Sequence, residues 1–161
     1  RIARVMKAPG LRYLDLDRIA VTTGPGKTSL APGEFVVEIR LPARPTGGGD
    51  AYLRSIPRTE MDIAVVGAGA ALVLDASGTC TSARIAIGAA APTVLLVEAA
   101  GAALVGSKLD DTALERMAEA VRAACKPISD KRGTVEYRTA MAAVLAKRVV
   151  QTARERAGAN T

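Results

Sequence analysis

The hydrophobic positions divide the chain into an extended half and a helical half. Strand-like runs, in which apolar residues alternate with polar ones or follow one another between turn signals, occupy residues 34–41, 51–55 and 61–74. The turn signal Asp75–Gly78 follows, and residues 81–89 then alternate again, as a returning strand would. A stretch with three consecutive glycines, residues 43–50, is expected to form a hairpin or a mobile loop. We therefore predict three or four antiparallel strands.

After Pro92 the period of the hydrophobic positions changes from two to 3.6, which predicts helices. We expect one helix from Thr93 to Val105 before Gly106, a second from Asp110 or Asp111 to Pro127, and a third from near Thr134 that frays into the tail RERAGANT. Their expected buried faces are Leu114, Met117, Val121 and Cys125 on the second, and Tyr137, Met141, Val144, Leu145 and Val149 on the third. Strands followed by helices predict an α+β fold, an antiparallel three- to four-stranded sheet covered on one face by three helices.

The composition excludes several classes of site. The chain has 161 residues, 49% of them hydrophobic, which suits one packed domain and argues against disorder. It has no histidine, so histidine-based triads and metal sites are excluded. Cys80 and Cys125 lack the CxxC spacing of a metal site, and as free thiols they suit a reducing cytoplasm. Charged residues interrupt the long apolar runs, so we expect no membrane span.

The chain has a formal charge of +6, and its basic residues are interleaved with acidic ones everywhere except in the last predicted helix. That helix gathers four basic residues, Lys147, Arg148, Arg154 and Arg156. Nucleic-acid binders usually add aromatic residues or a recognition motif to such a patch, and the chain has only four aromatic residues. We therefore expect no nucleic acid and a solvated helix face; a docking surface for an acidic partner protein is the alternative.

Two glycine-rich segments resemble nucleotide-binding motifs without completing them. Gly24–Thr28 ends like a phosphate-binding P-loop, but valine stands where the motif needs its first glycine and no helix pattern follows. Val65–Leu72 resembles a dinucleotide fingerprint, but leucine replaces the third glycine and a strand-like segment follows. We expect Gly67 and Gly69 instead to let the strand bend or bulge against close-packed neighbours.

Four segments in order together resemble one family. They are PGKTSLAPGEFVVEIRLP, YLRSIPRTEMDIAVVGAGAAL, ARIAIGAAAPT and PISDKRGTVEYRTAMAAVLAKR. The chain resembles the FAD-binding medium subunit of the molybdenum hydroxylases, which include the carbon monoxide dehydrogenase and xanthine dehydrogenase flavoproteins. The resemblance covers the second half of such a subunit: residues 34–161 match its C-terminal domain. Residues 1–33, where ARVM and LRYLDL read as short strands and TTGPGK as a loop, match the end of the central FAD-binding domain.

The resemblance implies electron transfer in an oxidoreductase. In that family the flavoprotein receives electrons from an iron–sulfur small subunit, itself reduced by a molybdopterin large subunit, and passes them through FAD to an external acceptor. The glycine-rich loops that hold the FAD pyrophosphate belong to an N-terminal half that this chain lacks. We therefore expect the chain alone to be inactive and to bind FAD weakly or not at all. The alternative is a non-catalytic assembly module that docks an acidic partner.

The resemblance also implies which residues lie beside the flavin ring. They are Val36, Arg54, Ser55, Arg58, Asp62 and Ile63. A guanidinium at position 54 would stabilise the negative charge that a reduced flavin gathers at its N1/O2 edge. Asp62 is expected to hold Arg58 or to accept a hydrogen bond from the loop backbone. The alternative is that these side chains are only solvated or form turns. No catalytic residue and no metal ligand is predicted.

The segment PISDKRG is expected to fix the turn between the second and third helices. Asp130 can cap the helix or pair with Arg132 or Arg138. Docking of the iron–sulfur subunit is the alternative role for this segment. Lys27 and Thr28 are expected to anchor a loop.

Overall fold

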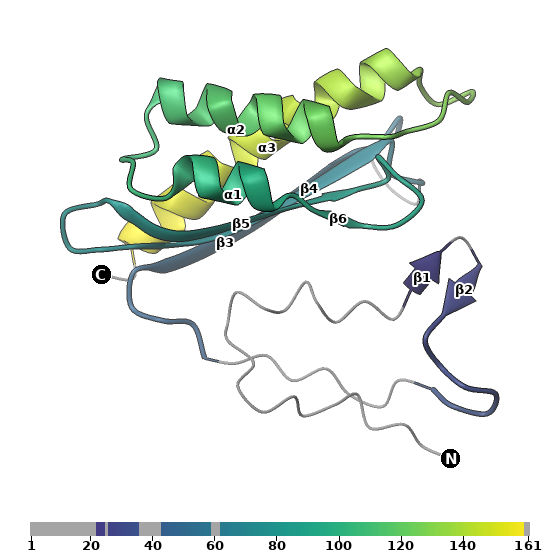
Figure 1. The fold of residues 1–161 in the computed structure, drawn as a ribbon, viewed down its shortest axis with the longest axis horizontal. Helices are drawn as coiled ribbons and strands as arrows, with labels where there is room; N and C mark the ends of the chain where they lie inside the picture. Colours follow the sequence, from purple (N-terminus) through teal and green to yellow (C-terminus); the bar gives the residue numbers. More distant parts are fainter. Residues whose placement is uncertain (1–21, 25, 36–42, 59–61, 160–161) are drawn as a thin grey trace.

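A four-stranded antiparallel sheet forms the centre of the molecule. The computed structural model describes residues 22–24, 26–35, 43–58 and 62–159. The sheet consists of β3 (Gly48–Ser55), β4 (Val66–Leu74), β5 (Cys80–Gly88) and β6 (Leu95–Leu96), hydrogen-bonded in that order. Two short strands, β1 (Thr22–Gly24) and β2 (Lys27–Thr28), pair in a separate hairpin (Figure 1).

Three helices cover one face of the sheet. They are α1 (Glu98–Leu104), α2 (Asp111–Ala124) and α3 (Val135–Gly158). α3 packs on β3 and β4, α1 packs on β5, and α2 packs mainly against α1 and α3. Figure 1 shows all three on the same side of the sheet, and no helix of the described residues lies on the other side. The predicted α+β fold is confirmed, and one sheet face is left without helices.

Side chains alternate between the two faces of the sheet, as the strand period requires. On β4, Ala68, Ala70 and Leu72 point towards the helices and are buried. The helices meet them with mostly small side chains, and the buried apolar residues of α3 are Ala142, Ala143, Leu145, Ala146, Val149, Val150, Ala153 and Ala157. Small side chains on both elements let the helix lie close to the sheet.

Side-chain caps start the two longer helices where the sequence predicted. The Asp110 carboxylate accepts a hydrogen bond from the backbone N–H of Ala113 at 2.9 Å and caps α2. The Thr134 hydroxyl accepts one from the N–H of Tyr137 at 3.2 Å and caps α3. Each cap satisfies a backbone donor that the first helical turn leaves free.

The first helix is shorter than the pattern predicted. The sequence predicts a helix from Thr93, but Leu95 and Leu96 form β6 and the helix begins at Glu98. Leu95 and Leu96 pair with β5, and the N–H of Val97 donates to the carbonyl of Ile85 at 2.9 Å. Hydrogen bonds to the free edge of β5 therefore outweigh the local helical pattern. β6 is the fourth strand of the sheet.

The buried face of α3 differs from the predicted stripe. Leu145 and Val149 are buried as expected, but Tyr137 is 48% and Val144 39% exposed, and Met141 is half-buried. The buried face is instead centred on alanines. In the sequence pattern, the larger apolar residues give a stronger hydrophobic signal than these alanines, so the pattern favours them as the buried face. The predicted fraying of the tail is also wrong, because α3 continues to Gly158 with Ala153 and Ala157 buried.

Three loop predictions also need correction. Part of the expected loop TTGPGK forms β1 and β2, so Lys27 and Thr28 lie in a strand. Residues 48–50 of the expected hairpin or mobile loop already belong to β3. The register of β4 is regular at Gly67 and Gly69, and its irregularity lies between Val73 and Leu74. No bulge lies at the two glycines, whereas the expected close packing is present at Gly67, where a Cβ atom would come within 2.6 Å of the Tyr52 hydroxyl.

Some predicted elements lie outside the described residues. Both short strands expected near the N-terminus fall there. The expected strand 34–41 is described only at Glu34 and Phe35, which are not in a strand. Val36, a predicted site residue, also lies outside the described residues. Within the described residues, no helix has the length and apolarity needed to cross a lipid bilayer.

Candidate functional site

The face of the sheet opposite the helices exposes a cation and an aromatic ring. We call it the helix-free face and define it by Tyr52, Arg54, Gly67, Gly69 and Gly88. Arg54 pairs with Gly67, which pairs with Gly88, so the three share this face in one row across β3, β4 and β5. Arg54 is exposed, and within the described residues no hydrogen bond or ion pair engages its guanidinium. The helix-free face thus presents an exposed cation on a strip of glycines.

Tyr52 lies beside Arg54 and was missed by the sequence reasoning. Its ring is 64% exposed and rests on the glycines of β4: a Cβ atom at Gly67 would come within 2.6 Å of the Tyr52 hydroxyl. Gly67 is also the strand partner of Arg54. The phenol therefore reaches the patch of sheet that Arg54 occupies. The signal was the spacing: Tyr52 and Arg54 are two positions apart, on the same face of one strand.

The loop after β3 carries an ion pair. The Nε of Arg58 donates to the Asp62 carboxylate at 3.0 Å, and the N–H of Ile63 donates to the same carboxylate at 2.8 Å. The Arg58 side chain is 75% exposed, whereas that of Asp62 is only 11% exposed. The predicted pairing of Asp62 with Arg58 and with the loop backbone is present. Asp62 thus binds both Arg58 and the backbone of Ile63, while the side chains of Arg58 and Ile63 stay exposed to solvent.

The surroundings of Asp62 lower the pKa of its carboxyl group. The hydrogen bond from Arg58 lowers the pKa of Asp62 most, followed by that from the N–H of Ile63; the positive charge of Arg132 adds to the effect. Arg132 belongs to the segment between α2 and α3, seventy residues later in the chain. The loop after β3 and the segment PISDKRG lie close together, since a Cβ atom at Gly133 would lie 3.5 Å from Cγ1 of Val65.

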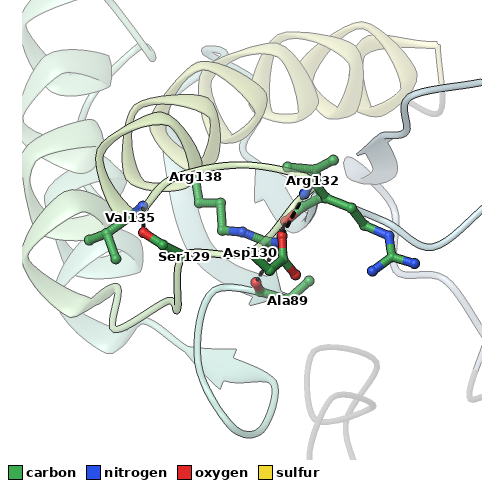
Figure 2. Close-up of polar contacts among 7 residues, drawn as sticks. Ala89, Ser129, Asp130, Arg132, Val135 and Arg138 are labelled. Atoms are coloured by element: carbon green, nitrogen blue, oxygen red, sulfur yellow. Dashed lines mark hydrogen bonds and ion pairs between the residues drawn. The ribbon is translucent and has the colours of Figure 1, made fainter.

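Asp130 organises the turn before α3 (Figure 2). Its carboxylate accepts hydrogen bonds from the N–H of Arg132 at 2.8 Å and from Nη2 of Arg138 at 2.7 Å. These two contacts, the first the larger, lower the pKa of Asp130 below its usual value. The Ser129 hydroxyl accepts the N–H of Val135 at 3.0 Å, which ties the turn to α3. The predicted pairing with Arg138 is present, while Arg132 contributes its backbone.

The structure brings most of the predicted site residues to one end of β3. Arg54 and Ser55 are its last two residues, and Arg58, Asp62 and Ile63 belong to the loop that follows. Ser55 is half-buried, and its carbonyl accepts the N–H of Val65 at 2.8 Å, which closes the base of this loop. Arg54 itself is exposed and pairs with Gly67 on the helix-free face.

The two nucleotide-like motifs do not form nucleotide sites. Gly26 and Lys27 turn into β2, and no helix follows Thr28 in the described residues up to Phe35. Gly67–Leu72 lies within β4, and a turn and β5 follow instead of a helix. Both segments therefore lack the helix N-terminus that would hold a phosphate.

The remaining polar candidates have structural partners. Cys80 is buried and Cys125 half-buried, both as free thiols, and the described residues contain no group of three acidic or cysteine side chains suited to a metal. Among the basic residues of α3, Lys147 pairs with Glu115 of α2, and Nη1 of Arg156 donates to the carbonyl of Asp50 at 2.7 Å. Half of the basic cluster thus joins elements within the chain.

Comparison with known proteins gives consistent matches. Residues 51–153 match the family described as CO dehydrogenase flavoprotein C-terminal domain. The carbon monoxide dehydrogenase medium chain of Afipia carboxidovorans is 44% identical over 131 residues, 81% of this chain and 44% of that protein. The putative xanthine dehydrogenase FAD-binding subunit of Escherichia coli K12 is 31% identical over 150 residues, 92% of this chain and 50% of that protein.

The fold matches as well. A structure of reconstituted CO dehydrogenase from Oligotropha carboxidovorans superimposes with a TM-score of 0.78 and 39% identity, over 85% of this chain and 47% of that chain. The chain spans about half the length of the curated relatives it matches.

Proposed function

Because the chain belongs to the CO dehydrogenase flavoprotein C-terminal domain family, we propose that it is the C-terminal part of the FAD-binding subunit of a molybdopterin-dependent oxidoreductase. In this proposal residues 34–161 form the C-terminal domain and residues 1–33 the end of the preceding domain. The observation that carries the proposal is the exposed Arg54 on the helix-free face, at the base of the loop that holds Arg58 and Asp62.

The exposed residues fit a flavin ring. Arg54 is a cation without a partner among the described residues, Tyr52 offers an exposed aromatic surface, and Ile63 is an exposed apolar side chain at 62%. A bound FAD would supply two-electron and one-electron redox chemistry. Arg54 would stabilise negative charge at the N1/O2 edge of the ring, and the Tyr52 ring would limit the access of water to it. The hydrogen bonds of Asp62 with Arg58 and with the N–H of Ile63 would hold these residues in place beside the ring.

Val36, Ser55 and Ile63 complete the proposed flavin surroundings. The aliphatic side chain of Val36 and that of Ile63 would pack against the ring, and Ser55 would close the loop beneath it through its backbone carbonyl. The chain contributes no general acid, general base or nucleophile in this proposal. Its residues bind, orient and shield the cofactor.

The partners follow from the proposed role. Electrons would arrive from an iron–sulfur small subunit that a molybdopterin large subunit reduces, and they would leave to an external acceptor. FAD would be held mainly by parts of the subunit outside these 161 residues, which span 44% and 50% of the two relatives. We place the complex in the cytoplasm, a proposal supported by two cysteines that are free thiols.

Copurification tests the proposed function. The gene product is expressed with the polypeptides encoded beside it, and flavin, iron and molybdenum are measured in the purified complex. We expect all three; a complex that contains iron and molybdenum but no flavin would contradict the assignment. In parallel, the 161-residue chain alone is titrated with FAD while flavin fluorescence is followed. We expect weak or no binding, and retention at micromolar FAD would show that the phosphate-binding half is dispensable.

A further inference from the structure

One buried arginine links α3 to the loop of the proposed flavin site. Arg138 is only 5% exposed. Its Nη1 donates to the carbonyl of Val65 at 2.7 Å. It also donates, more weakly, to the carbonyl of Ala89 at 3.4 Å, while Nη2 donates to Asp130 at 2.7 Å (Figure 2). A buried cation requires partners, and here one carboxylate and two carbonyls supply them.

Val65 connects Arg138 to the base of the loop that follows β3. Its N–H donates to the carbonyl of Ser55 at 2.8 Å, and its carbonyl accepts from Arg138 at 2.7 Å. Val65 is 3% exposed, so without Arg138 its carbonyl would lose a partner in a place that water barely reaches. Ser55, Val65 and Arg138 are thus joined in series at the base of the loop that carries Arg58 and Asp62.

The turn before α3 also packs against Val65. Asp130 and Gly133 form a bridge through backbone hydrogen bonds of 3.1 and 3.2 Å. A Cβ atom at Gly133 would lie 3.5 Å from Cγ1 of Val65 and 3.6 Å from Cγ of Arg138. From this turn, Arg132 contributes to the lowered pKa of Asp62. The turn therefore packs against Val65, whose N–H binds the carbonyl of Ser55 at the base of the loop.

We propose that Arg138, held by Asp130, is a positioning residue that fixes Val65 and, through it, Ser55, and so sets where Arg58 and Asp62 lie relative to the flavin. This inference rests on the proposed function, since the position of the loop matters for redox chemistry only if flavin binds there. A lysine cannot replace Arg138, because one ammonium cannot reproduce the planar fork that serves Val65 and Asp130 together. The buried Nε of Arg138 has no hydrogen-bond partner within the described residues, which costs some stability, whereas the two Nη atoms are bonded.

The test uses the flavin-containing complex with Arg138→Lys, and with Arg148→Lys as control on the exposed face of the same helix. Amide hydrogen exchange is followed in peptides covering residues 55–65 and, for comparison, in β5. In Arg138→Lys we expect exchange at 55–65 to rise about tenfold with β5 unchanged, the effect of losing one buried hydrogen bond locally. We also expect the flavin reduction potential to shift, which a purely structural role would not cause. Arg148→Lys should change neither.

Each outcome decides the inference. Unchanged exchange at 55–65, or faster exchange with an unchanged flavin potential, would overturn it. If Arg138→Lys does not fold, Asp130→Asn replaces it, because it weakens the hold on Arg138 and keeps the arginine in place; the same two measurements then apply. A wild-type complex without flavin would instead refute the proposed function, and the exchange data would still show whether Arg138 holds the loop.

Discussion

Gly49 of β3 lies directly against the backbone of Ala153 in α3. A Cβ atom at position 49 would overlap the carbonyl oxygen of Ala153 and lie 2.6 Å from the backbone N of Ala157. Beside this contact, Arg156 donates to the carbonyl of Asp50 at 2.7 Å. The absence of a side chain at Gly49 therefore sets how closely the last turns of α3 approach the edge strand.

Gly49→Ala should destabilise the fold. The new methyl group would meet helix backbone, which cannot move as a flexible side chain can, and we expect a loss of about 1–3 kcal/mol in the free energy of unfolding. Gly69→Ala is the matched control, because its Cβ would lie 3.8 Å from the Tyr52 ring, an ordinary contact. Urea unfolding measures both. Equal midpoints for the two variants would contradict the close approach at Gly49.

Arg54→Gln should make the flavin harder to reduce. Removing a positive charge beside the ring withdraws roughly 1–4 kcal/mol from the anionic reduced form, the Coulomb range for unit charges about 4 Å apart in water or near a protein surface. The reduction potential of the flavin-containing complex should fall accordingly. Arg154→Gln, on the exposed face of α3, is the control and should leave the potential unchanged. An unchanged reduction potential in Arg54→Gln would mean that the flavin ring does not lie beside Arg54.

Asp130→Asn should reduce stability in a pH-dependent way. Hydrogen bonds from the N–H of Arg132 and from Arg138 hold the pKa of Asp130 below its usual value of about 3.9. A carboxylate with a lowered folded-state pKa stabilises the fold above the unfolded-state pKa, and that contribution is lost as the pH falls below it. The difference in the free energy of unfolding between wild type and Asp130→Asn should thus be largest near neutral pH and disappear as the pH falls below about 4.

Urea midpoints measured at several pH values check this expectation. Glu119→Gln, an exposed carboxylate on α2, serves as the control for removing a surface charge. A gap between wild type and Asp130→Asn that is constant across the acid range would mean that the carboxylate contributes no charge-dependent stabilisation.

The two thiols should react in a fixed order. Burial raises the pKa of Cys80 to about 11, and it also raises the pKa of the half-buried Cys125. Because the thiolate is the reactive form, a thiol reagent near pH 8 should label Cys125 first and Cys80 only as fast as the protein opens. Mass spectrometry of labelled peptides resolves the order, with Cys125→Ser to isolate Cys80. Rapid labelling of native Cys80 would contradict its burial.

The sequence predicted the elements whose signals agree with each other. The segment after the Asp75–Gly78 turn returned as β5, and the caps at Asp110 and Thr134 start α2 and α3. The prediction failed at Thr93, because the free edge of β5 is created by a tertiary contact that no local pattern records. It also failed along α3, where alanines form the buried face and larger residues such as Tyr137 stay exposed.

The candidate site was predicted in part. The expected contacts of Asp62 with Arg58 and with the loop backbone are both present. Tyr52 was missed because aromatic residues were counted as scarce instead of being placed on a strand face. Arg138 was identified as a partner of Asp130, but its contact with Val65 joins residues 73 positions apart and has no signature in the sequence. Contact of any of these side chains with flavin stays a prediction.

The alanine-rich interface between α3 and the sheet determines how this domain can vary. An alanine side chain is a single methyl group, so a substitution that shortens it removes little volume. A larger side chain at Ala142, Ala146 or Ala153, by contrast, must push the backbones of the helix and its neighbour apart. Evolution of the domain is therefore expected to proceed through its periphery. Libraries that aim to retune the cofactor should diversify the loop and the open strand face, and keep the helix seam fixed.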